Sequence, residues 1–131
     1  MVGFSNLSGR WEGEYTYPNG VLPVTPFLAV LVDRNGHLSG SVVEPNTIAV
    51  GTLEARLAGT RDGVGVDFTK TYPACSGPDY ANPVDYVGTI SDEGNVIRGR
   101  WSILDIDGSF EMRREVETEV VGEVEYVEAP C

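Results

Sequence analysis

The chain has 131 residues, a length that suits a single domain. Hydrophobic residues make up 41% and charged residues 22%, which is typical of a globular protein rather than a disordered chain. Twenty acidic against nine basic residues give a formal net charge of -11, and this charge repels both a phosphate backbone and an anionic membrane surface. We therefore expect neither nucleic acid nor a membrane as a partner.

The scarcity of histidine and cysteine excludes much metal and nucleophile chemistry. One histidine and two cysteines cannot build a histidine-rich or CxxC metal site, so we expect no metal and no cofactor. Cys75 and Cys131 can bond to each other only in an oxidising setting, and we expect free thiols. No basic region followed by an apolar core opens the chain, and the longest apolar run, residues 27–32, is too short to cross a bilayer. A cytoplasmic location is the expectation.

Short runs of alternating apolar and polar residues, separated by Asn-Gly and Asp-Gly turns, dominate the chain and predict β-strands. Asn35-Gly36 is the strongest hairpin signal, because both residues tolerate a positive φ. Residues 49–59 suit a helix by propensity, yet they alternate and are flanked by glycines, so we predict a strand there. The expected strands cover residues 11–17, 27–33, 38–44, 49–59, 64–72, 84–90, 97–103 and 110–113.

Eight sequential strands without a long helix predict an all-β fold. Closure into an eight-stranded antiparallel up-and-down β-barrel removes the exposed sheet edges, and a two-sheet sandwich is the alternative. We assign residues 1–114 to the barrel domain. Residues 115–131 alternate glutamate with valine and tyrosine, and they are either a ninth strand or a solvated acidic tail.

The segment Ser8-Gly9-Arg10-Trp11-Glu12-Gly13-Glu14-Tyr15 resembles the start of the calycin superfamily, in which Gly-x-Trp commonly begins the first strand. Lipocalins, fatty-acid-binding proteins and avidins belong to this superfamily. The resemblance covers residues 5–114 and implies a barrel with a small-molecule cavity. It also implies that the first strand lies beside the last, so we expect Trp11 and Trp101 to be buried near each other. The biotin-binding residues of avidins are not recognisable.

A shorter likeness links Tyr15-Thr16-Tyr17-Pro18-Asn19-Gly20 to the Tyr-x-Tyr strand of phenolic acid decarboxylases, which are also small barrels. The aromatic-rich strand that follows in that family is missing here. The likeness implies chemistry based on paired tyrosine hydroxyls.

Strand alternation gathers one set of side chains on the face that would line the barrel. Aromatic residues dominate this set, which suits a small apolar or aromatic ligand with a polar group. Glu44 and Lys70, the only lysine, fall on the same face, where they either pair or extend to solvent at the rim. If the protein is an enzyme, these two are the catalytic candidates. The expected ligand-binding residues are Trp11, Tyr15, Tyr17, Phe68, Tyr72, Tyr86 and Trp101.

Two function classes follow from this interior. The first is a small-molecule-binding β-barrel with an aromatic-lined central cavity. The second is a cofactor-independent isomerase, cyclase or lyase that acts inside the barrel. A third, separate reading is an interaction module that uses the acidic segment. A homodimer is a candidate assembly. The long loop over residues 73–83 is either a cover for the barrel mouth, with Tyr80 as its gate, or an exposed connector.

Overall fold

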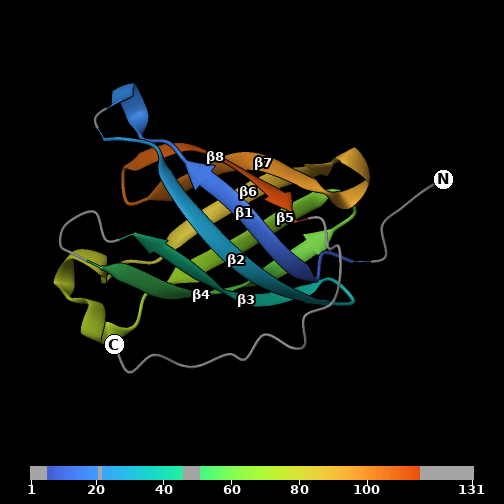
Figure 1. The fold of residues 1–131 in the computed structure, drawn as a ribbon, viewed down its shortest axis with the longest axis horizontal. Coiled ribbons are helices and arrows are strands. Elements are labelled where there is room, and N and C mark those ends of the chain that lie inside the picture. The colour runs from blue at the N-terminus through green and yellow to red at the C-terminus, as the bar shows by residue number, and fades with distance from the viewer. Residues whose placement is uncertain (1–5, 21, 46–50, 116–131) are drawn as a thin grey trace.

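The protein is an eight-stranded antiparallel β-barrel in which every strand pairs with the next and β8 pairs with β1 (Figure 1). The computed structural model describes residues 6–20, 22–45 and 51–115. Within this part the elements are β1 (Gly9–Tyr15), η1 (Pro18–Gly20), β2 (Thr25–Arg34), β3 (His37–Pro45), β4 (Thr52–Asp62), β5 (Gly65–Thr71), η2 (Ala74–Ser76), η3 (Pro78–Tyr80), β6 (Val84–Ser91), η4 (Asp92–Gly94), β7 (Val96–Ile103) and β8 (Ile106–Arg114). The prediction of a closed barrel is confirmed, and the sandwich alternative is wrong.

The strand order follows the alternation of apolar residues along the chain. In β4 the side chains of Leu53, Ala55 and Leu57 are buried, whereas Glu54 is half-buried and Arg56 exposed, so residues 52–59 of the segment with helical propensity form a strand. Burial of one face outweighs the intrinsic helix preference of alanine, leucine, glutamate and arginine in this context. All eight strands bury the inner face and leave the outer face to solvent.

The tight β2–β3 hairpin confirms the strongest turn prediction. Asn35 and Gly36 form its two-residue loop with φ values of 56° and 91°. Two positive φ angles are what a hairpin turn with the twist of the flanking strands requires. The loop fixes the register in which Asp33 pairs with Leu38 and Leu31 with Gly40.

Glycines stand where the curved sheet brings neighbouring strands closest together. A Cβ atom at Gly99 of β7 would overlap the carbonyl oxygen of Val87, and one at Gly59 of β4 would overlap that of Asp67. Glycine in a strand commonly marks such bends and close backbone approaches. These positions let eight strands close around a packed interior.

Trp11 closes one end of the barrel, which we call the tryptophan end. Its ring is fully buried, and its indole Nε1 donates a hydrogen bond of 3.0 Å to the carbonyl oxygen of Leu7. The guanidinium carbon of Arg114 lies 4.9 Å from the ring centroid. Arg114 also donates to the carbonyl oxygens of Ser8 and Gly94, at 2.8 and 2.7 Å. One arginine thereby ties the last strand to the segment before β1.

Asp33 is buried at the same end and joins three parts of the chain. It accepts hydrogen bonds from the backbone N–H groups of Leu7 and Gly36, each at 2.9 Å, and from Nε of Arg61 at 2.7 Å. Burial by itself raises the pKa of Asp33, but the hydrogen bonds from Arg61, Leu7 and Gly36 outweigh it and lower the pKa. The hydrogen bonds from Arg61, Leu7 and Gly36 therefore stabilise the ionised form of the Asp33 carboxylate.

Trp101 is buried as expected, but it does not lie near Trp11. On β8, Trp11 pairs with Arg114 whereas Trp101 pairs with Gly108, six positions away along the strand. Trp101 belongs to the opposite end, where Nε1 donates to the carbonyl oxygen of Thr16 at 2.8 Å. The expectation of neighbouring tryptophans is wrong, because placing the first strand beside the last does not fix the register between them.

Two further expectations concern the cysteines and the C-terminal segment. Cys75, in η2, is disulfide-bonded, so the expectation of a free thiol is wrong for this residue. Cys131 and residues 116–130 lie outside the described residues, so the ninth strand and the acidic tail both stay predictions.

Replacing Trp11 with alanine tests how much the tryptophan end contributes to folding. We expect Trp11→Ala to lower the free energy of unfolding by about 3–5 kcal/mol, because it leaves a cavity under Arg114. Leu104, which is 81% exposed, offers the control substitution Leu104→Ala, which should change stability by less than about 0.5 kcal/mol. Urea denaturation followed by circular dichroism measures both values, and equal effects would contradict this packing role.

Candidate functional site

A cluster of buried polar side chains occupies the end of the barrel opposite Trp11, which we call the polar end. Glu44 reaches it because Leu38, Gly40, Val42 and Glu44 alternate along β3 toward the interior. Glu44 and Lys70 are both only 3% exposed. The prediction that both residues point inward agrees with this placement.

Glu44 accepts hydrogen bonds from three side chains of three other parts of the barrel. Nζ of Lys70 lies 2.8 Å from Oε1 of Glu44. The hydroxyls of Tyr15 and Tyr72 lie 2.8 and 2.7 Å from Oε2. These donors come from β1, from β5 and from the residue just beyond β5, so the carboxylate joins opposite sides of the barrel wall.

Aromatic rings surround the ammonium group of Lys70. Its Nζ lies 4.8 Å from the ring centroid of Tyr15, 5.0 Å from that of Tyr72 and 5.5 Å from that of Tyr86. A cation over the face of an aromatic ring is attracted by the ring quadrupole, and more strongly when water is excluded. The charge of Lys70 is therefore compensated by one carboxylate and three rings.

The tyrosine hydroxyls of the cluster are held in the protonated form. Burial, and then the negative charge of Glu44, raise the pKa of Tyr15 above its usual range. Burial also raises the pKa of Tyr72, although the nearby Lys70 partly opposes this effect. Tyr86 has a raised pKa for the same main reason, burial. At neutral pH these phenols act as hydrogen-bond donors.

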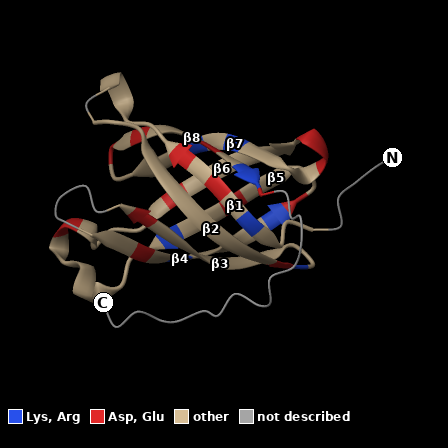
Figure 2. Cartoon of the chain, viewed as in Figure 1, with Lys and Arg blue, Asp and Glu red and all other residues tan. Residues whose placement is uncertain are grey.

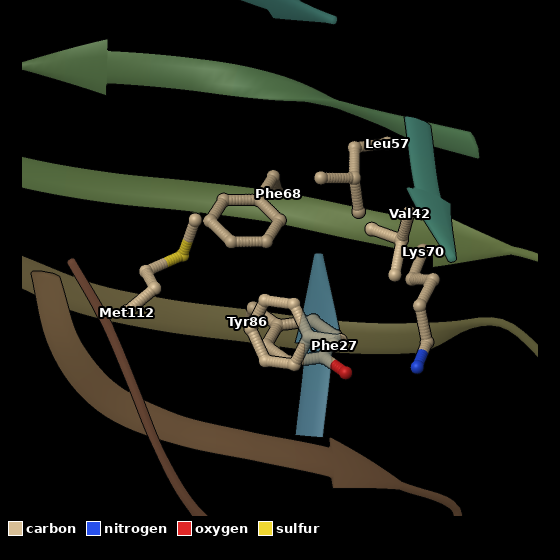
Figure 3. A pocket seen from close by; sticks show the side chains of 7 residues that line it. All are labelled: Phe27, Val42, Leu57, Phe68, Lys70, Tyr86 and Met112. Carbon is tan, nitrogen blue, oxygen red and sulfur yellow. The ribbon is translucent and has the colours of Figure 1, made fainter. Parts of the chain in front are cut away.

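A small cavity lies below the cluster, in the middle of the barrel. Its volume is about 10 Å³, which is about the space that one water molecule needs. Figure 3 shows the lining side chains pointing toward one another from several strands; they are Phe27, Val42, Leu57, Phe68, Lys70, Tyr86 and Met112. An organic ligand does not fit into this cavity without a rearrangement of side chains.

Aromatic residues continue from the cluster to the surface. Tyr72 is half-buried, and its ring lies 4.9 Å from the ring of Tyr80 in η3. Tyr17 packs edge-on against Tyr15 and Trp101, each at 5.6 Å. The 73–83 loop thus places Tyr80 at the polar end. The prediction that this loop covers the mouth of the barrel requires such a position.

The structure brings most of the candidate residues together and leaves one apart. Trp11 lies at the other end and contributes to closure rather than to the cluster. Phe68 and Tyr86 stack at 5.2 Å beneath Lys70. The residues around the polar end are Tyr15, Tyr17, Glu44, Lys70, Tyr72, Tyr86 and Trp101.

Two interior aromatic residues were missed by sequence reasoning. Phe27 packs against Tyr15 at 6.1 Å, and Phe110 lies edge-on to Tyr86 at 5.0 Å. Both stand at inward positions of their strands, so the alternation that identified Tyr86 was a sufficient signal for them. Asp33 and Arg61 gave no such signal, because a charged residue near a turn is ordinarily solvated.

Comparisons with known proteins support the fold and give no family. No family model matches the chain, and no curated protein matches it. A redesigned β-barrel superposes with a TM-score of 0.68 at 14% identity, over 85% of this chain and 92% of that one. The redesigned β-barrel mFAP1, bound to DFHBI, gives a TM-score of 0.64 at 13% identity, over 83% and 94%. A de novo designed fluorescence-activating β-barrel gives 0.62 at 17% identity, over 88% and 100%.

The described residues hold no group of three or more histidine, cysteine, aspartate or glutamate side chains that could hold a metal ion. In the same part of the chain, no helix is long and apolar enough to cross a membrane.

The raised pKa values make the phenols of the cluster a probe of its burial. We expect Tyr15, Tyr72 and Tyr86 to ionise only above pH 10, the usual value for tyrosine, and largely together with unfolding. Unfolded tyrosines release their protons first, so these groups stabilise the fold below pH 10 and lose that contribution as the pH rises further. Phenolate absorbance during an alkaline titration measures this. Titration of all six tyrosines near pH 10 would contradict it.

A double-mutant cycle tests the buried Glu44–Lys70 pair. We expect Glu44→Gln and Lys70→Met each to cost about 3–5 kcal/mol of stability, because each leaves the partner charge buried and unpaired. The double variant should recover most of this loss, since neither charge remains. Urea denaturation of all four proteins gives the coupling energy. Additive losses would show that the two side chains do not interact as described.

Proposed function

We propose that the protein binds a small, neutral aromatic ligand with a hydroxyl group at the polar end of the barrel. The single observation that carries this proposal is the convergence of Lys70, Tyr15 and Tyr72 on Glu44. In this cluster Lys70, Tyr15 and Glu44 are buried and Tyr72 is half-buried.

Burial of the Glu44–Lys70 ion pair costs desolvation free energy, and folding of the barrel does not depend on having an ion pair there. Buried ion pairs are often neutral for stability or worse than apolar residues of similar volume. Among the described residues, the hydrogen bonds to Glu44 come from side chains, so within that part of the chain it fixes no turn or chain end. A site for a ligand with a polar group gives such a cluster a purpose.

Tyr72 indicates the chemistry of the ligand. It donates to Oε2 of Glu44, and it is the donor of the three that reaches the surface. A phenolic ligand that replaces the Tyr72 hydroxyl would preserve the hydrogen bond and gain stacking partners. An anionic ligand is less suitable, because it would meet the charge of Glu44 and a net charge of -11.

The small volume of the central cavity is an argument for binding at the polar end rather than at the centre of the barrel. Space for about one water molecule lies beneath Lys70, so a ligand at the centre would have to displace Phe68 or Tyr86. Movement of Tyr72 and Tyr80 at the end of the barrel requires less repacking. The proposal therefore moves the expected ligand from an aromatic-lined central cavity to the polar end.

The solved structures with a similar fold support the proposal through their shared barrel architecture. The redesigned β-barrel mFAP1, whose fold is similar to that of this chain, is bound to DFHBI. At 13% identity this likeness reaches the fold and not the residues of a site. It supports the idea that a barrel of this size can accept a small molecule.

The enzyme alternative, an isomerase, cyclase or lyase without a cofactor, has less support. A general base needs a free lone pair aimed at the substrate. Three of the roughly four acceptor sites of the Glu44 carboxylate already receive hydrogen bonds, and the raised pKa values keep the phenols of Tyr15 and Tyr72 protonated.

Relationship, assembly and location stay predictions. A relation to the calycin superfamily is supported by the buried Trp11 and by β1 lying beside β8. The homodimer and the lack of nucleic acid or membrane partners rest on the sequence. The expected cytoplasmic location is weakened by the disulfide-bonded Cys75, since disulfides persist mainly in oxidising compartments.

Phenol and toluene, which differ by one hydroxyl, test the proposed chemistry. We expect phenol to bind more tightly than toluene in a titration followed by tryptophan fluorescence. Tyr72→Ala should raise the affinity for phenol about tenfold, because it vacates the position beside Oε2 of Glu44; tenfold corresponds to about 1.4 kcal/mol.

Tyr17→Ala is the matched control, since Tyr17 packs in the same aromatic group but is not one of the three donors to Glu44 described above. It should leave the ratio of the phenol and toluene affinities unchanged. Native mass spectrometry of protein from its own host should also reveal a retained aromatic molecule. Equal affinities for phenol and toluene in both the wild type and Tyr72→Ala would overturn the proposal.

A further inference from the structure

The outer surface of the barrel carries an apolar stripe on β2 and β3. We define the outer stripe as Leu28, Val30 and Val32 of β2 with Val43 of β3. Leu28, Val32 and Val43 are 53%, 36% and 39% exposed, and Val30 is half-buried. Leu28 and Val43 are cross-strand partners, so the stripe is continuous over both strands. Figure 2 shows β2 uncharged along most of its length, beside charged positions on β1.

Arginines flank the outer stripe on both sides. Arg10 of β1 pairs with Val30, Val30 pairs with Ser41, and Ser41 pairs with Arg56 of β4. This register places one row across four strands with a positive residue at each end. Both arginine side chains are exposed. An occupant with apolar residues interleaved with acidic ones would suit this surface.

The chain beyond the described residues has that composition. Residues 116–131 contain five valines, five glutamates and no lysine or arginine. Its starting point is close to the stripe: the backbone N–H of Glu115 donates to the carbonyl oxygen of Arg10 at 2.9 Å. The carboxylate of Glu115 also lies 3.7 Å from Nε of Arg10.

The disulfide bond of Cys75 indicates where the C-terminal end of this segment is attached. Cys75 is disulfide-bonded, and the chain has one other cysteine, Cys131. In a monomer the bond therefore joins Cys131 to η2. η2 follows β5 at the polar end, whereas Glu115 follows β8 at the tryptophan end. A bond within one chain would therefore require residues 116–131 to span the distance between the two ends of the barrel.

The length of the segment permits this path. Sixteen residues in extended conformation span up to about 53 Å, and the ten-residue strand β2 is about 33 Å long. The excess allows a route around the barrel from β1 across β2, β3 and β4. That route crosses the outer stripe.

We propose that residues 116–130 pack on the outer stripe and that a Cys75–Cys131 disulfide fastens this segment across the barrel. The valines cover Leu28, Val32 and Val43, and the glutamates face Arg10 and Arg56. This inference is independent of the ligand at the polar end.

The disulfide is tested first, by peptide mapping of the full chain without reduction. We expect a single linked peptide pair containing Cys75 and Cys131, in protein that light scattering shows to be a monomer. Free thiols overturn the proposal. A disulfide between two chains also overturns it, because a second copy then becomes the occupant of the stripe.

The packing is tested by digestion with a protease that cleaves after glutamate, for which the segment offers five sites. We compare the wild type with the double variant Leu28→Thr, Val43→Thr, which removes apolar area, places a β-branched residue suited to a strand at both positions and adds no cleavage site. We expect cleavage within residues 116–130 to be at least about tenfold faster in the double variant. The control Val87→Thr alters a residue of β6, 57% exposed, that is not part of the stripe.

The control should digest like the wild type, and circular dichroism should show the same barrel in all three proteins. Equal cleavage rates in the wild type and the double variant overturn the packing even if the disulfide is found. Cleavage that is accelerated equally by Val87→Thr also overturns it, since the stripe would then have no special role.

Discussion

Pairing of β1 with β8 is the constraint on which the rest of the structure depends. Once Trp11 stands opposite Arg114, the sheet has no free edge and the two faces become an inside and an outside. Every side chain at an inward position must then be apolar, paired or hydrogen-bonded, because water is excluded there. The two buried carboxylates, Asp33 and Glu44, meet this requirement in different ways at the two ends.

Asp33 joins backbone segments, whereas Glu44 joins side chains. Asp33 accepts from the N–H groups of Leu7 and Gly36, so its loss would release the chain before β1 and the β2–β3 turn. Glu44 accepts from Lys70, Tyr15 and Tyr72, and none of these contacts holds a backbone group. The contacts at the tryptophan end thus hold the barrel closed. The side chains around Glu44 at the polar end can rearrange without unfolding a turn.

Alternation along the strands predicted the barrel and the inward placement of Glu44 and Lys70, because a period of two fixes the face of every residue once the strands are known. It did not predict that Trp11 and Trp101 lie at opposite ends, since that depends on the stagger between β1, β7 and β8. Alternation along the strands also does not predict the volume of the cavity inside the barrel. Whether Phe68 and Tyr86 enclose a ligand or fill the space depends on how their rings stack, and they stack at 5.2 Å.

A filled interior changes what the Glu44 cluster has to do. In an open barrel, buried charges at the mouth would meet water and would need few partners. Here Phe68, Tyr86 and Phe110 pack beneath the cluster, so Lys70 is kept dry and its charge must be met by Glu44 and three aromatic rings. Tyr72, half-buried, is then the point at which an outside molecule reaches this network with the least disturbance of the core.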